Sequence, residues 1–183
     1  FFDAFEKGLG VTRTEFGLAI GIQMLFWGFF APIFGLLADK FGGNKAVFLG
    51  FLIFAFGIFM LYSGPNTGIY FQLALGVLVG IALGATAIGV PVSEVGKHFP
   101  NETRTIATGV VTAAASIGYF LSPLLTKYSL LQFDWEQTLK YFMIFIVIGL
   151  IVSIFLFPAK TIINSSQADR DQTFLSAIKE AFS

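Results

Sequence analysis

The sequence predicts an all-α protein, a polytopic bundle of transmembrane helices, and three observations support this prediction. The chain of 183 residues is 56% hydrophobic and only 12% charged, whereas soluble domains are about 25% charged. It contains 24 Phe beside two Trp and five Tyr, and a Phe side chain has no polar atom that needs a partner in hydrocarbon. Long runs without any charge recur along the chain. Lipid is therefore the expected solvent.

The charge-free runs place the spanning helices. A charged side chain near the bilayer centre costs roughly 2.5–3.5 kcal/mol, so a span needs about 20 residues without one. The run from residue 46 to 93 is too long for one span and contains SGPNTG at residues 63–68, where Gly and Pro end a helix. We therefore expect five complete spans, at about residues 16–38, 46–62, 69–93, 105–126 and 139–157.

Residues 1–160 are expected to form an N-terminal transmembrane bundle. Phe1 is not an initiator Met and no basic stretch precedes an apolar one, so we expect a piece of a longer chain that starts in the end of an earlier helix. Residues 161–183 are expected to be a cytoplasmic linker with a short amphipathic helix that leads to a missing second half. Its apolar face comprises Phe174, Leu175, Ile178 and Phe182.

Lys and Arg are distributed unevenly between the two expected sides of the membrane. If residues 39–45 face the cytoplasm, that side holds seven of the eleven cations. An excess of Lys and Arg marks the cytoplasmic side. We therefore expect a multi-pass protein of the bacterial cell membrane, with the end of this chain in the cytoplasm. The seven are Lys40, Lys45, Lys97, Arg104, Lys160, Arg170 and Lys179, and the other four are Lys7, Arg13, Lys127 and Lys140.

The spans differ in their side chains. Residues 46–62 and 139–157 are bulky around their whole circumference, which favours lipid contact. Small residues recur at every fourth position in 69–93 and 105–126, and Gly also recurs in 16–38. Because small residues let membrane helices approach closely, these three spans are expected to pack inside and to line a path. The fourfold repeats are Gly76, Gly80 and Gly84, and Ala114, Gly118 and Ser122.

A polar hinge, GLLADKFGGNK at residues 35–45, separates the first two spans. Gly35 and Gly42 suit a tight turn that needs unusual backbone angles or close approach. Asp39 follows the carboxyl end of a helix, where the helix dipole disfavours an anion. It is therefore expected to pair with Lys40, with Lys45 or with the amino end of another helix. The alternative is a solvated turn at the membrane surface.

Two charges beyond the hinge are candidates for the same side of the membrane. Glu94 ends the span 69–93 and is expected to pair with Arg104 or the hinge lysines in an inner gate, or else to reach the interface alone. Arg104 begins the next span and either joins this gate or anchors the helix end. Six polar residues within spans are candidates to line a cavity, although Ser and Thr can instead bond to their own helix. They are Gln23, Gln72, Thr86, Thr112, Ser116 and Tyr119.

Other functions find no support in the composition. Net charge is zero, with no cluster of Lys and Arg for nucleic acid, and there is no Cys. The single histidine, His98, has no carboxylate or Cys at metal-ligand spacing, and no Ser/His/Asp arrangement or phosphate loop occurs. We therefore expect no metal, no cofactor, no catalytic residue and no enzymatic activity.

The hinge resembles the G-x-L-x-D-[R/K]-x-G-x-[R/K]-[R/K] loop between the second and third helices of major facilitator superfamily transporters. Residues 98–109, HFPNETRTIATG, are similar to the segment joining helices 4 and 5 in the monocarboxylate and oxalate/formate branch. Residues 134–136, DWE, stand where that branch has G-W-R before helix 6, and residues 173–182 are similar to its helix ahead of helix 7.

This resemblance implies the N-terminal half of a carrier, with most of helix 1 and all of helices 7–12 missing. It implies secondary transport by alternating access, and a small organic anion such as a mono- or dicarboxylate as substrate. A coupling proton or a counter-anion, membrane lipid and the second half of the chain are the other expected partners. Alternatives are a drug or sugar carrier of the same superfamily, or a receptor or scaffold that does not transport. The implied inner gate comprises Gly35, Asp39, Lys40, Gly42, Lys45, Glu94 and Arg104.

Overall fold

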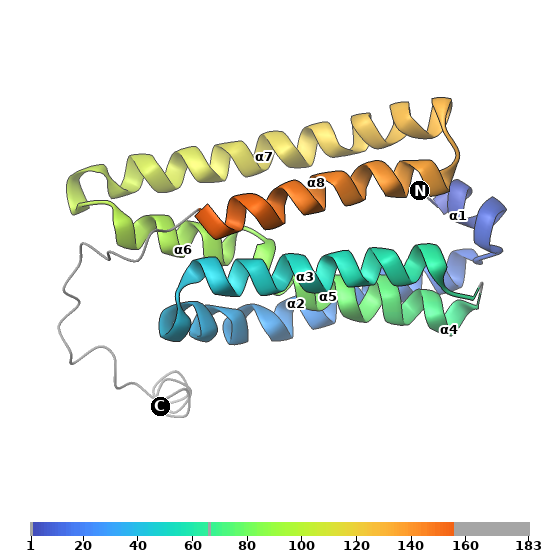
Figure 1. Cartoon of the computed structure of the whole chain (residues 1–183), viewed down its shortest axis with the longest axis horizontal. Coiled ribbons are helices and arrows are strands. Elements are labelled where there is room, and N and C mark those ends of the chain that lie inside the picture. The colour runs from blue at the N-terminus through green and yellow to red at the C-terminus, as the bar shows by residue number, and fades with distance from the viewer. Residues whose placement is uncertain (1, 66, 156–183) are drawn as a thin grey trace.

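In the computed structural model, which describes residues 2–65 and 67–155, helices joined by short connections are the only regular secondary structure within those ranges (Figure 1). The linker and amphipathic helix expected at residues 161–183 lie outside the described residues, as do the last two residues of the expected span 139–157. The elements are α1 (Phe2–Leu9), α2 (Arg13–Phe41), α3 (Gly43–Ser63), α4 (Gly68–Phe71), the π-helix η1 (Gln72–Leu78), α5 (Val79–Thr86), α6 (Gly89–His98), α7 (Asn101–Gln132) and α8 (Trp135–Phe155).

Five helical stretches are long and apolar enough to cross a membrane, so the predicted all-α bundle with five complete spans is confirmed for the described residues. They are Arg13–Phe41, Gly43–Ser63, Gly68–His98, Asn101–Gln132 and Trp135–Phe155. The third of these stretches comprises α4, η1, α5 and α6. It is interrupted where Ala87 is extended (φ −67°, ψ 179°), four residues ahead of Pro91, which has no N–H to continue the helical ladder.

The fourfold glycine repeat of the span expected at 69–93 packs tightly against α2, which confirms the predicted close packing of this span. A Cβ at Gly76 would lie 3.1 Å from the backbone oxygen of Ala19, and one at Gly80 only 2.7 Å from that of Gln23. A Cβ at Gly84 would meet the backbone of Phe30 at 2.9 Å. The repeat therefore lets the two backbones approach closely along the whole contact.

The prediction that the span 46–62 faces lipid is wrong for one side of α3. Gly43, Ala46, Val47, Gly50, Gly57, Ile58 and Leu61 are all buried there. Gly50 lies against Ala85, and Gly57 lies against the backbone of Ala74, so these two glycines form a narrow packing face among large side chains. The opposite side of α3 does carry exposed Leu and Phe. Helix α8, which covers most of the span 139–157, is likewise buried on one side, where it packs on α3. Its buried residues are Thr138, Leu139, Ile146 and Ser153.

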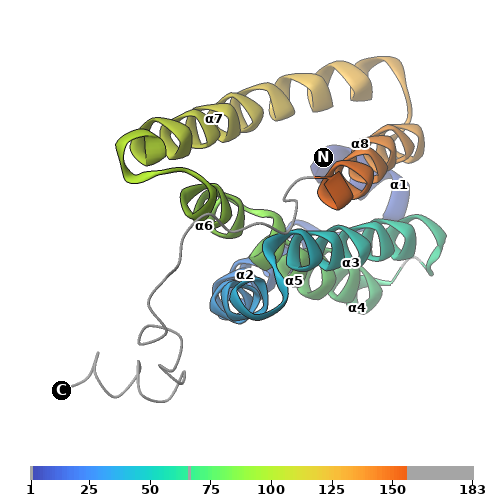
Figure 2. The ribbon, with the colours of Figure 1, turned by 60° about the vertical axis from the view of Figure 1, so that its left-hand side comes forward.

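The prediction that the span 105–126 is a packed inner helix is also wrong in this structure. Thr126 is the only buried residue in α7, and nothing lies within 4 Å of a Cβ built at Gly118. Figures 1 and 2 both show α7 running apart from α2, α3 and α5 and returning through α8. Its small-residue repeat is therefore not matched by a partner helix among the described residues.

The glycines of α2 also play no part in close packing. A Cβ at Gly17, Gly21, Gly28 or Gly35 would meet nothing within 4 Å. The contact side of α2 is instead formed by residues such as Ala19, which is fully buried, and Phe34, which is 3% exposed. The sequence thus identified α2 as a packed helix but assigned the contact to the wrong face.

Two cavities flank α8. One of about 820 Å³ lies between α1, α7 and α8, and charged residues such as Asp3 and Lys127 line it. The other, of about 470 Å³, lies between α2, α3, α5 and α8 and is almost wholly apolar. Gln23 is the one strongly polar side chain among the residues that line this second cavity.

Candidate functional site

Most of the hinge, residues 35–45, is helical in the structure, and the connection between the two helices is a single residue. Gly42 alone separates α2 from α3, and its φ of +97° lies in the region that glycine favours. Its N–H donates to the carbonyl of Ala38 at 2.9 Å and so closes the last turn of α2. Asp39 is placed in that last turn, directly beside the first turn of α3.

A second helix, α6, lies at the same junction of α2 and α3, although it is about 50 residues further along the chain. Helix α6 carries Glu94 and Lys97 three residues apart, a spacing that puts both on one face. It packs against α2 and α3 as well as α7. The face with Glu94 and Lys97 is therefore directed at the junction of α2 and α3.

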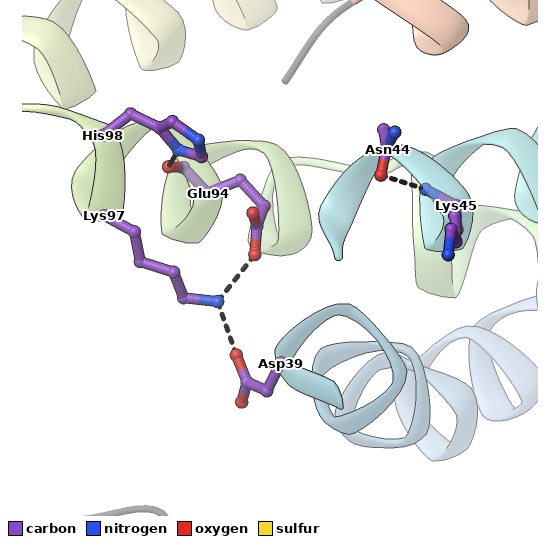
Figure 3. A network of polar contacts seen from close by, with 6 residues as sticks. All are labelled: Asp39, Asn44, Lys45, Glu94, Lys97 and His98. Carbon is purple, nitrogen blue, oxygen red and sulfur yellow. Dashed lines mark hydrogen bonds and ion pairs between the residues drawn. The ribbon is translucent and has the colours of Figure 1, made fainter. Parts of the chain in front are cut away.

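Asp39, Glu94 and Lys97 form a charge cluster at this junction (Figure 3). The Nζ atom of Lys97 lies 2.5 Å from Oδ1 of Asp39 and 2.6 Å from Oε1 of Glu94. One ammonium group thus binds two carboxylates, which come from α2 and from α6. The cluster joins two helices that are far apart in the sequence.

The three side chains differ in exposure. The Asp39 side chain is 61% exposed and that of Lys97 is 33% exposed, whereas that of Glu94 is only 6% exposed. An exposed ion pair contributes about 0.2–1 kcal/mol, because water screens it. A buried carboxylate that loses its cation costs more, since it stays out of water without compensation. Glu94 is therefore the more consequential of the two acids for stability.

The predicted partners of Asp39 and Glu94 differ from those observed. Asp39 pairs with Lys97, and not with Lys40 or Lys45. The Nζ of Lys40 instead lies over the ring of Phe41, 5.3 Å from the ring centroid. The backbone N–H of Lys45 donates to Oδ1 of Asn44, and its exposed side chain has no ion pair among the described residues. The structure assigns these hinge lysines no contact with the cluster.

The predicted pair between Glu94 and Arg104 is also absent from the described ion pairs. Arg104 lies in the first turns of α7 beside Gly96, whose built Cβ would be 4.0 Å from the arginine Cγ and Cδ. Its Nε is buried without a hydrogen-bond partner. The alternative for Arg104, an anchor at the helix end, stays a prediction.

The six polar residues expected in a cavity have different surroundings. Gln23 lines the apolar cavity, Gln72 begins the π-helix η1, and Tyr119 is 61% exposed on α7. The hydroxyl groups of the other three donate to carbonyls four residues earlier, at 2.9–3.0 Å. These three are Thr86, Thr112 and Ser116.

Lys97 is the functional residue that the sequence prediction lacks. The sequence predicts it only as one of the cations of the cytoplasmic side, although it is the centre of the cluster. Its spacing of three from Glu94 is the signal that could have identified it. The pairing of Lys97 with Asp39 leaves no local pattern in the sequence, because the two residues are 58 positions apart.

The whole chain, residues 1–183, matches the family model of the Major Facilitator Superfamily. The chain belongs to the major facilitator superfamily. Together with the five apolar helices found among the described residues, this makes it an integral, multi-pass membrane protein. The residues that carry the motif resemblance, 35–45, span the junction of α2 and α3.

Several curated relatives are superfamily transporters. The riboflavin transporter RibZ of Clostridioides difficile is 32% identical over 144 residues, covering 78% of this chain and 28% of that protein. The probable nitrate transporter NarT of Staphylococcus carnosus is 23% identical over 158 residues, covering 85% and 39%. The MFS transporter asaE of Aspergillus flavus is 27% identical over 133 residues, covering 72% and 29%. The chain thus matches between 28% and 39% of the length of these relatives.

Proposed function

We propose that this chain is the N-terminal helical part of a secondary transporter that works by alternating access, and that it has no enzymatic activity. The observation that carries the proposal is the charge cluster, in which Lys97 of α6 binds Asp39 of α2. Membership of the superfamily and the transporter names of the relatives support the same function. The proposed partners are membrane lipid, a small-molecule solute, a coupling proton or counter-anion, and a C-terminal half.

The cluster is proposed to act as a latch on the cytoplasmic side. It lies at the ends of α2 and α6, and the cations Lys40, Lys45, Lys97 and Arg104 gather at this side of the described bundle. This excess supports a cytoplasmic location in a bacterial cell membrane. Because Asp39 is largely exposed, its ion pair with Lys97 is weak enough to form and break during a transport cycle.

We propose a small organic anion, such as a mono- or dicarboxylate, as the solute. The resemblance of residues 98–109 and 134–136 to the monocarboxylate and oxalate/formate branch supports this class, and one relative carries the name of an anion, nitrate. The interiors of the five spans contain no Lys or Arg. The cation that an anion needs at mid-membrane is therefore expected outside these spans.

A drug or sugar carrier remains the second candidate for the solute. The apolar cavity of about 470 Å³ beside Gln23 supports a largely apolar drug, whereas a sugar would need more polar side chains than Gln23 to bind its hydroxyl groups. Uptake of labelled lactate, oxalate, nitrate, riboflavin and glucose by vesicles with the full-length transporter separates these classes. Saturable uptake of the uncharged solutes alone would reject the organic anion.

Asp39→Asn in the full-length transporter tests the latch. The change keeps the shape of the side chain and removes the charge that Lys97 binds, so we expect uptake to fall at least several-fold while the amount of protein in the membrane stays the same. Glu102→Gln is the matched control, because Glu102 is an exposed acid in the first turn of α7, outside the cluster. Equal uptake by the wild type and Asp39→Asn would reject the latch. A receptor or scaffold would show no saturable uptake in any variant.

A further inference from the structure

We propose that Glu94 is a positioning residue that holds Lys97 beside Asp39, and that Gly43 provides the space in which Glu94 is held. The inference rests on the proposed function of the charge cluster as a latch, and it adds a third helix, α3, to that latch. Neither the hinge motif nor the charges of the cluster identify Gly43 by themselves.

The contact between Gly43 and Glu94 leaves no room for a side chain. A Cβ built on Gly43 would lie 2.1 Å from Cγ, 2.4 Å from Cδ and 2.8 Å from Oε2 of Glu94. Gly43 itself is buried as the first residue of α3. The φ angle of Gly43 is not positive, unlike that of Gly42. Glycine is therefore required at position 43 for space and not for backbone conformation.

The amino end of α3 also suits an anion. The first N–H groups of a helix lack partners within the helix and carry a partial positive charge. The first turn of α3 contains no acidic residue, and Gly42 has no side chain to cap it. The Oδ1 of Asn44 accepts from the N–H of Lys45, so Asn44 satisfies one of these donors. The carboxylate of Glu94, supplied by α6, is the acidic group that lies against this helix end.

The position of Glu94 constrains Lys97. Both residues are on α6, and the Nζ of Lys97 lies 2.6 Å from Oε1 of Glu94 while Oε2 is the oxygen nearer Gly43. A buried carboxylate fixed between α3 and Lys97 restricts the ammonium to the neighbourhood of Asp39. Because Glu94 and Lys97 are both on α6, a movement of α6 away from α3 takes Glu94 from Gly43 and Lys97 from Asp39 at the same time.

Zero-length cross-linking measures this geometry without a transport assay. A water-soluble carbodiimide activates the Asp39 carboxylate, the Lys97 amine attacks it to form an amide, and the reagent leaves as a urea that carries the oxygen of the carboxylate. The Asp39–Lys97 link joins a peptide of α2 to a peptide of α6, whereas a Glu94–Lys97 link stays within α6. Mass spectrometry of the digested full-length protein, cross-linked in its membrane, distinguishes the two products.

Gly43→Ala is the decisive variant, and Gly28→Ala is its matched control because Gly28 lies outside the hinge and a Cβ there meets nothing within 4 Å. We expect Gly43→Ala to displace Glu94 and to lower the Asp39–Lys97 yield at least threefold, with no change in Gly28→Ala. In a Glu94→Ala background there is no carboxylate to displace, so Gly43→Ala is expected to cause no further loss. An unchanged yield in Gly43→Ala, or an equal loss in both backgrounds, would overturn the proposal.

The single variant Glu94→Ala decides the question if Gly43→Ala does not accumulate in the membrane. Removing Glu94 abolishes a competing cross-link, which alone would raise the Asp39–Lys97 yield, whereas a loss of positioning lowers it. We expect the lower yield, and a higher or equal one rejects the role of Glu94. Because the readout is a distance between two groups, it stays informative even if Asp39→Asn leaves uptake unchanged and the latch function fails.

Discussion

The ammonium group of Lys97 lies 2.5 Å from the carboxylate of Asp39, although 58 residues separate the two in the sequence. The contact joins the last turn of α2 to the last turn of α6. Both side chains reach water, so the contact is weak compared with the burial of the helices themselves. It is therefore suited to bias the position of α6 relative to α2 and not to hold the bundle together.

Removing Lys97 is expected to destabilise the protein more than removing the charge of Asp39. In Lys97→Ala the buried carboxylate of Glu94 loses its cation, which costs about 1–3 kcal/mol, whereas Asp39→Asn costs about 0.2–1 kcal/mol. Thermal unfolding of the full-length protein in detergent, followed by circular dichroism, gives the order of the two melting temperatures. Lys40→Ala is the control, since Lys40 is directed at Phe41. If the melting temperature falls further in Asp39→Asn than in Lys97→Ala, the assignment of Glu94 as the buried acid and Asp39 as the exposed one is contradicted.

The contact between α2 and α5 is expected to be sensitive at Gly80 and insensitive at Gly21. A Cβ at Gly80 would lie 2.7 Å from the backbone oxygen of Gln23, and backbone cannot move aside as a side chain can. Gly80→Ala is therefore expected to lose about 1–3 kcal/mol of stability by overpacking. Gly21→Ala meets nothing within 4 Å and should unfold at the wild-type temperature or slightly above it. Equal melting temperatures for the two variants would place the helix contact elsewhere.

The orientation of the bundle is expected to put position 45 inside the cell and position 67 outside. The 183 residues contain no Cys, so single cysteines can be introduced without removing others from this part of the protein. Lys45 and Thr67 are both exposed and lie at opposite ends of α3. A membrane-impermeant maleimide added to intact cells should label Thr67→Cys and not Lys45→Cys. Labelling in inverted vesicles should be the reverse, and the opposite pattern would place the charge cluster on the outer face.

Much of the fold follows from simple rules applied to the sequence. Charge-free runs locate the five spans because an isolated charge in hydrocarbon is costly, and the turn at residues 63–68 divides the longest run as the structure does. The fourfold repeat of Gly76, Gly80 and Gly84 identified a close helix contact that the structure contains. Each of these features depends on residues that are near one another in the chain.

The features that the sequence did not reveal depend on contacts between distant residues. The sequence predicts Lys40, Lys45 or the amino end of another helix as the partner of Asp39, whereas the cation in the structure is Lys97 of α6. The burial of one side of α3 arises from Gly50 and Gly57, seven residues apart, a spacing that large neighbouring side chains obscured. The repeat at Ala114, Gly118 and Ser122 resembles a packing face, yet no partner helix covers it among the described residues.

The one-residue connection at Gly42 also limits how this part of the protein can vary in length. A residue added between α2 and α3 would rotate the start of α3 away from Glu94, because the connection has no slack to absorb it. The segment between Ser63 and Gly68, at the far end of α3, is longer and leaves room for extra residues. Epitope tags and fusion partners therefore belong at that far end, where an insertion leaves the spacing of Asp39 and Gly43 unchanged.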